Sequence, residues 1–124
     1  MDARRIALAC AWIGALFFAV IGVWAFVAPH SFFTTVALYP PYAHHLFHDV
    51  GAFQLGIAAG LLAGIAGRAP LAVGLWAGSV GGVMHAISHW IDRSLGGRST
   101  DPVFLTILAA VLVAGLVAAE VERR

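Results

Sequence analysis

Two histidines one helical turn apart are the first candidates for chemistry in this sequence. They stand at the ends of the segment HAISH, His85–His89. In a helix, a spacing of four residues places both imidazoles on one face. Such a pair can chelate one transition metal ion, because imidazole is a common ligand of zinc, copper and iron. The segment lacks the glutamate of the HExxH motif, so it does not predict a zinc peptidase.

A second group of ionisable side chains stands in the segment HHLFHDVGAFQ, residues 44–54. His45 and Asp49 are also four residues apart, and they are candidates to complete a site of three or four ligands. Asp49 is expected either as the fourth ligand or as a carboxylate that orients an imidazole through its other nitrogen. Further polar groups that could support such ligands without touching the ion are His48, Gln54 and Asp92.

The composition indicates that lipid is the solvent for most of this chain. Hydrophobic residues make up 61% of the 124 residues and charged residues only 10%, whereas ordinary globular proteins carry roughly 25% charged residues. The net charge is +1, and no basic patch predicts binding to nucleic acid. Cys10 is the one cysteine, which excludes a disulfide within the chain.

Four apolar segments are each close to the length that a helix needs to cross a bilayer. They lack the alternation of barrel strands, so we expect membrane-spanning helices. The first segment is too long for the core of a signal peptide, and we expect it to be retained. The sequence therefore predicts one all-α membrane domain, 1–124, a bundle of four helices at about 6–28, 49–66, 71–92 and 102–121.

The arginines predict the orientation of these helices. If the helices run up-down-up-down, five arginines fall on one side of the membrane and two on the other. Arginine-rich segments stay in the cytoplasm, so both termini are expected there, with the protein in the plasma (inner) membrane. The cytoplasmic set is Arg4, Arg5, Arg68, Arg123 and Arg124, and the outer set is Arg93 and Arg98.

Glycines recur every fourth residue in the second and third helices. Small residues at this spacing let membrane helices approach closely, and the short link 67–70 predicts an antiparallel hairpin. Counted outward from that link, Asp49 comes level with Ser88, and His45 with Asp92. The predicted metal ligands at the outer end are therefore His45, Asp49, His85 and His89, and the predicted packing glycines are Gly56, Gly60, Gly64, Gly74, Gly78 and Gly82.

Two other interpretations of the histidines stay open. A haem held by two histidines needs a gap wide enough for the macrocycle, which tight glycine packing between the second and third helices disfavours. Alternatively, the histidines and Asp49 only join the hairpin's outer end through hydrogen bonds. A proton or ion path across the membrane is not expected, because the inner halves of these helices carry no ionisable residue.

The segments PPYAHHLFHDVGAFQLGIAAG and MHAISHWID resemble small four-helix membrane proteins of actinobacteria with a DoxX-like layout. Shared features are a Pro-Pro-Tyr, a His four residues before Asp-Val-Gly-Ala, and a later His-x-x-x-His. The resemblance implies that His45, Asp49, His85 and His89 belong to one site, and it leaves His44 and His48 outside the pattern. It implies no established reaction, but the DoxX-like layout implies a link to quinone or thiol redox systems.

Together, these features predict a small integral membrane protein with an outward-facing His/Asp site for a transition metal ion, namely zinc, copper or iron. It would act as an accessory or redox-related subunit. One alternative is a structural subunit of a larger membrane complex without a metal, and another is a membrane oxidoreductase that acts on quinone or lipid. The expected partners are the lipid bilayer and either a larger membrane complex or further copies of the chain.

Overall fold

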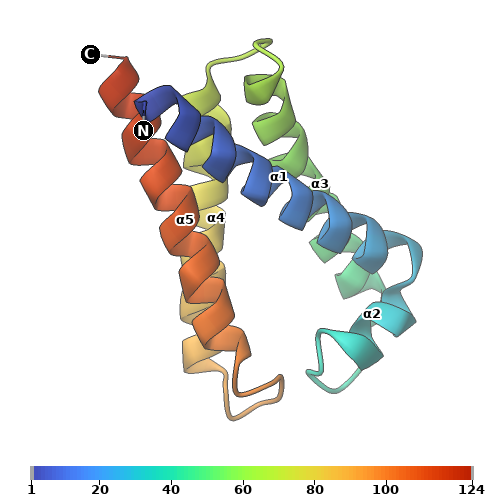
Figure 1. Cartoon of the computed structure of the whole chain (residues 1–124). Coiled ribbons are helices and arrows are strands. Elements are labelled where there is room, and N and C mark those ends of the chain that lie inside the picture. Colours follow the sequence, from blue (N-terminus) through green and yellow to red (C-terminus); the bar gives the residue numbers. More distant parts are fainter. Residues whose placement is uncertain (1, 124) are drawn as a thin grey trace.

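The computed structural model describes residues 2–123, which form five helices and no strand. Four of these helices are long and apolar enough to cross a membrane, as judged by length and composition. The predicted all-helical fold with four candidate membrane spans is thus confirmed, with one short helix in addition. The helices are α1 (Ala3–Val27), α2 (Pro29–Thr35), α3 (His44–Ile65), α4 (Leu71–Ile91) and α5 (Asp101–Glu122) (Figure 1).

Local sequence explains where the helices begin and end. The Asp2 side chain accepts a hydrogen bond from the Arg4 backbone N–H and caps α1, as short polar side chains do at helix N-termini. Pro29 cannot continue α1, because it lacks a backbone N–H, but it fits the first turn of α2. Helix α3 begins at His44, five residues before the predicted start, so the histidines of HHLFH are helical.

The helices pack as two pairs, α1 with α3 and α4 with α5. Figure 1 shows that the pairs approach each other at the end that carries both termini and the α3–α4 connection. Toward the opposite end the pairs diverge. We call this opposite end the loop end; it carries α2, the segment 36–43 and the α4–α5 connection 92–100.

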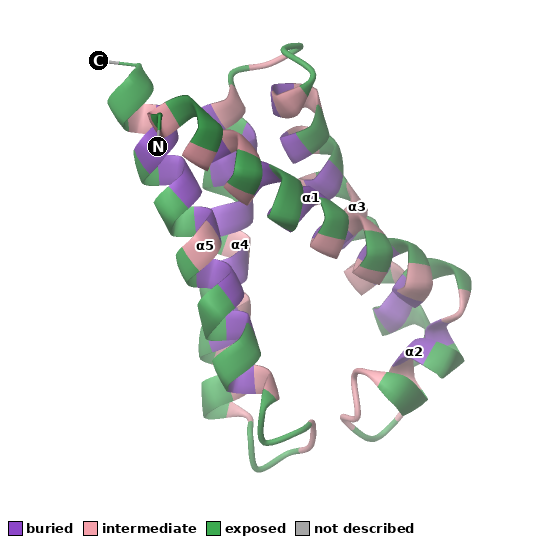
Figure 2. Ribbon diagram, in the orientation of Figure 1, coloured by how far each residue is buried: buried purple, intermediate pink, exposed green. Residues whose placement is uncertain are grey.

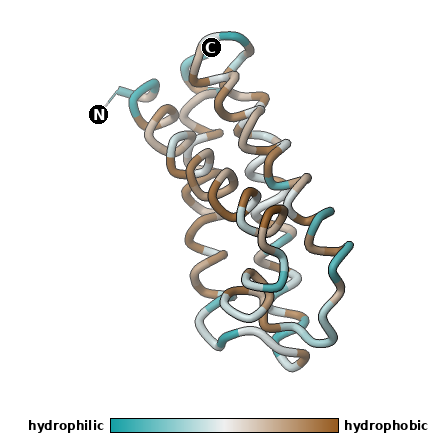
Figure 3. The backbone as a smooth tube through the Cα atoms, turned by 90° about the vertical axis from the view of Figure 1, so that its right-hand side faces the viewer, coloured by the Kyte–Doolittle hydropathy of each residue, from teal (hydrophilic) through white to brown (hydrophobic). Residues whose placement is uncertain are grey.

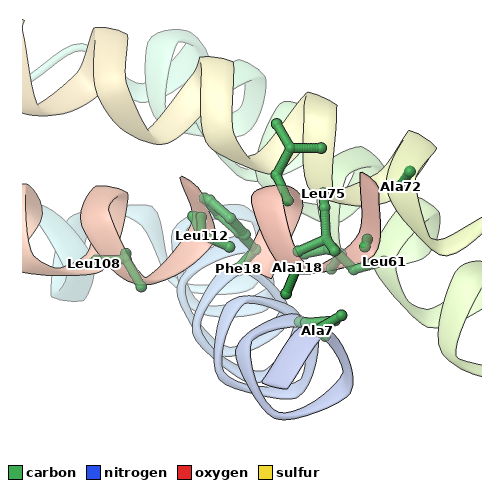
Figure 4. Close-up of a cluster of buried hydrophobic side chains, with 13 residues drawn as sticks. Ala7, Phe18, Leu61, Ala72, Leu75, Leu108, Leu112 and Ala118 are labelled. Carbon is green, nitrogen blue, oxygen red and sulfur yellow. The ribbon is translucent and has the colours of Figure 1, made fainter. Parts of the chain in front are cut away.

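The hydrophobic core lies where the two pairs meet. Its four largest fully buried side chains, Phe18, Leu61, Leu75 and Leu112, come one from each long helix, and they converge in Figure 4. Buried residues follow the faces on which helices touch, while the outward faces are exposed (Figure 2). Those exposed faces are rich in large apolar residues, and polar residues gather toward the two ends (Figure 3). This distribution fits a bilayer around the helices.

The glycines of α3 and α4 meet only near the α3–α4 connection. A Cβ on Gly74 would lie 2.7 Å from the Gly60 carbonyl oxygen, and one on Gly64 would lie 2.9 Å from the Leu71 Cα. At Gly56 a Cβ would meet no atom of the described residues within 4 Å. The structure thus differs from the predicted stripe: at this level α3 meets α4 through the Ile57 side chain, which would lie 3.2 Å from a Cβ on Gly81, and not through Gly56.

Of two further glycines in the predicted stripe, Gly82 faces α5, and Gly78 faces α5 as well as the Leu61 side chain of α3. A Cβ on Gly78 or on Gly82 would lie 3.5 or 3.2 Å from the Leu112 side chain of α5. A close contact of α1 with α3 lies at two glycines outside the predicted stripe: a Cβ on Gly51 would lie 2.8 Å from the Gly22 carbonyl oxygen. Glycine therefore fixes the separation within the α1–α3 pair as well as between the pairs.

Replacing Gly74 with alanine should destabilise the protein, whereas replacing Gly56 with alanine should not. The new Cβ at Gly74 would press on the backbone of α3, and such overpacking costs about 1–3 kcal/mol. The midpoint of SDS-induced unfolding in detergent micelles measures the difference. Gly56→Ala is the matched control, since it lies on α3 in the same stripe; equal losses in the two variants would contradict the packing described above.

Candidate functional site

The divergence of the helix pairs leaves a cavity of about 560 Å³ at the loop end. Its wall is built by residues of all five helices and of the two loop-end segments, and it is mostly apolar and aromatic. Ligand sites in proteins are commonly of this size and combine apolar walls with a few polar groups. The polar side chains on this wall include Tyr39, Gln54, His85, His89, Arg98 and Asp101.

His85 and His89 lie together on the α4 side of the cavity, as their spacing predicts. Their Nε2 atoms are 3.1 Å apart, and their ring centroids are 4.8 Å apart. A neutral imidazole has one protonated and one bare ring nitrogen. Two bare nitrogens at this distance would repel each other, so either a proton or a cation must lie between them.

Tyr39 extends this pair to a chain of three side chains. Its Oη is 3.1 Å from His89 Nδ1, and its ring meets the His89 imidazole edge-on, 5.4 Å between centroids. Burial, and then the negative charges of Asp101 and Asp92, raise the pKa of Tyr39 above its ordinary value. The phenol therefore keeps its proton at neutral pH.

Two glycines hold Tyr39 in place. Gly96 and Gly97 have φ values of +153° and +77°, which favour glycine, and the Gly97 N–H donates to the Leu38 carbonyl at 3.0 Å. A Cβ on Gly97 would lie 2.7 Å from Tyr39 Oη. Tyr39 was not among the predicted site residues. The Gly-Gly pair signals a turn, but nothing in the sequence indicates that this turn packs on residue 39.

His45 and Asp49 do not join the histidines of α4. Their side chains are 89% and 53% exposed, with His45 Nε2 3.6 Å from Asp49 Oδ2, and neither lines the cavity. Within residues 2–123, no three His, Cys, Asp or Glu side chains are close enough to hold one metal ion. The predicted four-ligand site is thus split in two, because α3 and α4 diverge at the level where the prediction required them to touch.

His48 pairs with His44 on the outside of α3 instead of supporting the α4 histidines. The two rings are 4.5 Å apart, His44 Nδ1 is 2.9 Å from Tyr42 Oη, and His48 packs on Phe26. The chain thus contains a second His-x-x-x-His pair, which does not line the cavity. This pair offers a natural control for the pair on α4.

Asp92 and Asp101 frame the α4–α5 connection at the loop end. Asp92 caps the C-terminus of α4, and Asp101 Oδ2 accepts a hydrogen bond from the Arg98 backbone N–H at 2.7 Å. The Arg98 guanidinium donates to the Thr35 carbonyl, which ties this connection to the end of α2. Asp92 does not line the cavity, but its negative charge contributes to the raised pKa of Tyr39, and it ends the helix that carries the two histidines.

Comparison with protein-family models, with curated proteins and with solved structures found no match to this chain. The resemblance to DoxX-like proteins of actinobacteria therefore stays a prediction from the residues alone. The geometry of the cavity and the groups along its wall are what indicate a function for this chain.

Replacing Gly97 with alanine should displace Tyr39 from His89, because the added Cβ would collide with the phenol. The ¹⁵N resonance of His89 Nδ1 reports the loss of that hydrogen bond. Gly67→Ala is the control: Gly67 also has a positive φ of +69°, but a Cβ there would meet no described atom within 4 Å. Both variants should lose about 1–2 kcal/mol from backbone strain. An unchanged His89 signal in Gly97→Ala would contradict the proposed role of Gly97.

Proposed function

We propose that this chain spans the plasma (inner) membrane four times, up-down-up-down, with both termini in the cytoplasm. The imbalance of the arginines, five against two, supports this orientation. The two termini and the α3–α4 connection also lie at one end of the molecule (Figure 1), as this topology requires. The loop end, with the cavity, then faces outward.

We further propose that the function of this cavity is to hold a transition metal ion between His85 and His89. The observation that carries the proposal is the 3.1 Å separation of the two Nε2 atoms. Nitrogen ligands lie about 2.0–2.1 Å from zinc, so one ion can contact both atoms at this separation. Zinc, copper and iron all accept imidazole.

The surroundings of the pair support this assignment. When His89 Nδ1 carries the proton and donates it to Tyr39 Oη, His89 Nε2 is bare and faces His85. Metal-binding imidazoles are usually oriented in this way by a bond at the other ring nitrogen. Two ligands from the protein leave coordination positions open toward the cavity, where a further ligand can bind. This arrangement suits an accessory or redox-related subunit.

Haem fits the arrangement less well than a single ion. A haem held by two histidines has one on each face of the macrocycle, whereas His85 and His89 project from one helix with their Nε2 atoms 3.1 Å apart. The cavity also takes its remaining polar groups from other elements, none of which is a histidine. A single ion is therefore the cofactor that we propose.

A second candidate is a structural role without a metal, within a larger membrane complex. The chain of contacts from Tyr39 through His89 to His85 joins the segment 36–43 to α4. One proton between the two histidines gives each Nε2 atom a hydrogen-bond partner. The three side chains then hold the segment 36–43 against α4 at the loop end. Stable co-purification of defined partner subunits, together with the absence of bound metal, would favour this candidate.

Metal binding should depend on the α4 histidines and not on the α3 histidines. We expect the purified protein to bind about one equivalent of Zn²⁺ or Cu²⁺ in equilibrium dialysis followed by elemental analysis. His85→Ala and His89→Ala should each reduce affinity at least tenfold, because one imidazole alone does not chelate.

The control variant is His44→Ala combined with His48→Ala, which removes the pair with the same spacing on α3. This variant should still bind about one equivalent of Zn²⁺ or Cu²⁺. The same is expected of His45→Ala combined with Asp49→Ala. Loss of metal in these controls, with retention in the α4 variants, would reverse the assignment. Absence of metal from the wild-type protein would favour the structural candidate.

Replacing Tyr39 with phenylalanine should weaken the site without abolishing it. The variant keeps the ring that packs on His89 but removes the hydroxyl that orients Nδ1. Loss of such an orienting bond typically lowers metal affinity by about tenfold or more. The measurement is the same dialysis, with Tyr42→Phe as control, since Tyr42 contacts His44 instead. An unchanged affinity in Tyr39→Phe would show that the phenol does not orient His89.

A further inference from the structure

The two histidines of α4 supply fewer ligands than a bound transition metal ion holds. Their Nε2 atoms are 3.1 Å apart, so an ion about 2.0–2.1 Å from each of them would be bonded at an angle of roughly 100°. This angle is close to that between two ligands of a tetrahedral ion, which has four. Within residues 2–123, no group of three His, Cys, Asp or Glu side chains is close enough to hold one ion. The remaining positions must therefore be filled by molecules from outside this part of the chain.

The cavity beside these histidines suits an apolar, planar molecule. Its wall is mostly apolar, and its volume of about 560 Å³ is large enough for two or more fused rings. Water is a poor occupant of such a cavity, because it needs several polar partners. Aromatic side chains gain from tilted or edge-on ring pairs beyond simple burial, so this wall favours a ring over an aliphatic chain. The aromatic residues on the wall are Phe17, Phe32, Tyr39, Phe47 and Phe104.

Phe104 connects the cavity with the lipid-facing surface. It lines the cavity from the first turn of α5, a candidate membrane span, yet 56% of its surface is exposed. At the loop end, by contrast, the Gly97 N–H donates to the Leu38 carbonyl, and the Arg98 guanidinium donates to the Thr35 carbonyl. These bonds join the two loop-end segments. A molecule dissolved in the bilayer thus has a route to the cavity beside Phe104.

The charges near the histidines favour an uncharged third ligand. Burial, and then the negative charges of Asp101 and Asp92, raise the pKa of Tyr39, whose hydroxyl contacts His89. The field of both carboxylates therefore reaches the site and opposes the charge of a bound cation. An anion would also be costly to move from water into an apolar cavity. Thiols lose a proton when they bind a metal ion, whereas an aromatic ring nitrogen binds through its lone pair and stays neutral.

We propose that the cavity takes an uncharged, lipid-soluble aromatic heterocycle whose ring nitrogen is a third ligand of the metal ion held by His85 and His89. Such a nitrogen is the same kind of ligand as imidazole, which zinc, copper and iron all accept. Its lone pair lies in the ring plane and forms the bond to the ion as a water ligand leaves. The ring itself then lies among the aromatic side chains. This binding mode rests on the metal ion of the proposed function and names the class of molecule that the site receives.

The experiment compares isoquinoline with naphthalene, which has the same fused rings but no nitrogen. Each probe is equilibrated by dialysis at neutral pH with the protein in lipid nanodiscs that contain either Zn²⁺ or EDTA. Binding to empty nanodiscs under the same condition is subtracted. With Zn²⁺, we expect isoquinoline to bind the wild-type protein at least about tenfold more tightly than naphthalene, because one bond to the ion is added. With EDTA, the two probes should bind equally.

His85→Ala should abolish the preference for isoquinoline, because it removes one of the two ligands that hold the ion. The control is His44→Ala combined with His48→Ala, which removes the histidine pair of α3 and should keep the preference. Co²⁺ in place of Zn²⁺ gives a second measurement, since its visible spectrum depends on its ligands. Isoquinoline should change that spectrum, and naphthalene should not.

Decahydronaphthalene, the saturated form of naphthalene, tests the aromatic wall. With EDTA present, and relative to its partition into empty nanodiscs, it should bind the protein more weakly than naphthalene does. Equal binding of these two probes would show that the wall does not select a ring, and it would overturn the aromatic class of ligand.

Three further outcomes would overturn the proposal, and none of them needs a variant to fold. Equal binding of isoquinoline and naphthalene in the presence of bound Zn²⁺ would remove the third ligand and leave the metal site in place. A preference for isoquinoline that persists with EDTA would show that the wall recognises the nitrogen without an ion. Absence of Zn²⁺ from the wild-type protein in the same dialysis would overturn the proposed metal site together with this ligand.

Discussion

The contact between the backbones of Gly60 and Gly74 is the constraint on which the loop end depends. It lets α3 and α4 touch near their connection, where no side chain keeps them apart. Toward the loop end, the side chains of Phe18, Leu61 and Leu112 fill the space between the helix pairs and keep the pairs apart. Helices held close at one end and separated by a core in the middle must diverge at the other end. The cavity is therefore a consequence of the backbone contact at Gly60 and Gly74 together with the large side chains that lie between the helix pairs beyond it.

The cavity determines which polar groups meet. His85 and His89 turn toward the opening between the pairs, as does Gln54 on the opposite side, whereas His45 and Asp49 remain on the outside of α3. Polar groups inside an apolar bundle are costly unless they are paired. The histidines meet this requirement through each other and Tyr39, but Gln54 Oε1 does not meet it within the described residues. The wall of this cavity thus carries one polar cluster that is internally bonded, next to Gln54, whose buried Oε1 has no partner among the described residues.

Composition and apolar segment length predicted the four long helices, because both report directly on the solvent of the chain. The pairing of His85 with His89 was also predictable, since it depends only on helical spacing. The partners across the bundle were not. Counting outward from the α3–α4 connection assumed two straight, parallel helices, and that assumption fails once Gly56 no longer touches α4. Tyr39 was missed because the turn at Gly96 and Gly97 that holds it lies more than 50 residues away in the sequence.

Spacing alone does not separate a functional histidine pair from an incidental one in this protein. His44 and His48 have the same four-residue spacing as the pair on α4, and their rings are even slightly closer, 4.5 against 4.8 Å. The difference lies in the surroundings. In the α3 pair, His44 is exposed and contacts Tyr42, whereas His48 is half-buried against Phe26, and neither lines the cavity. The α4 pair is partly buried beside an apolar cavity. There each Nε2 atom has the other as its partner, so a proton must lie between them when no ion is bound. A metal ion bound at this place would take the position of that proton.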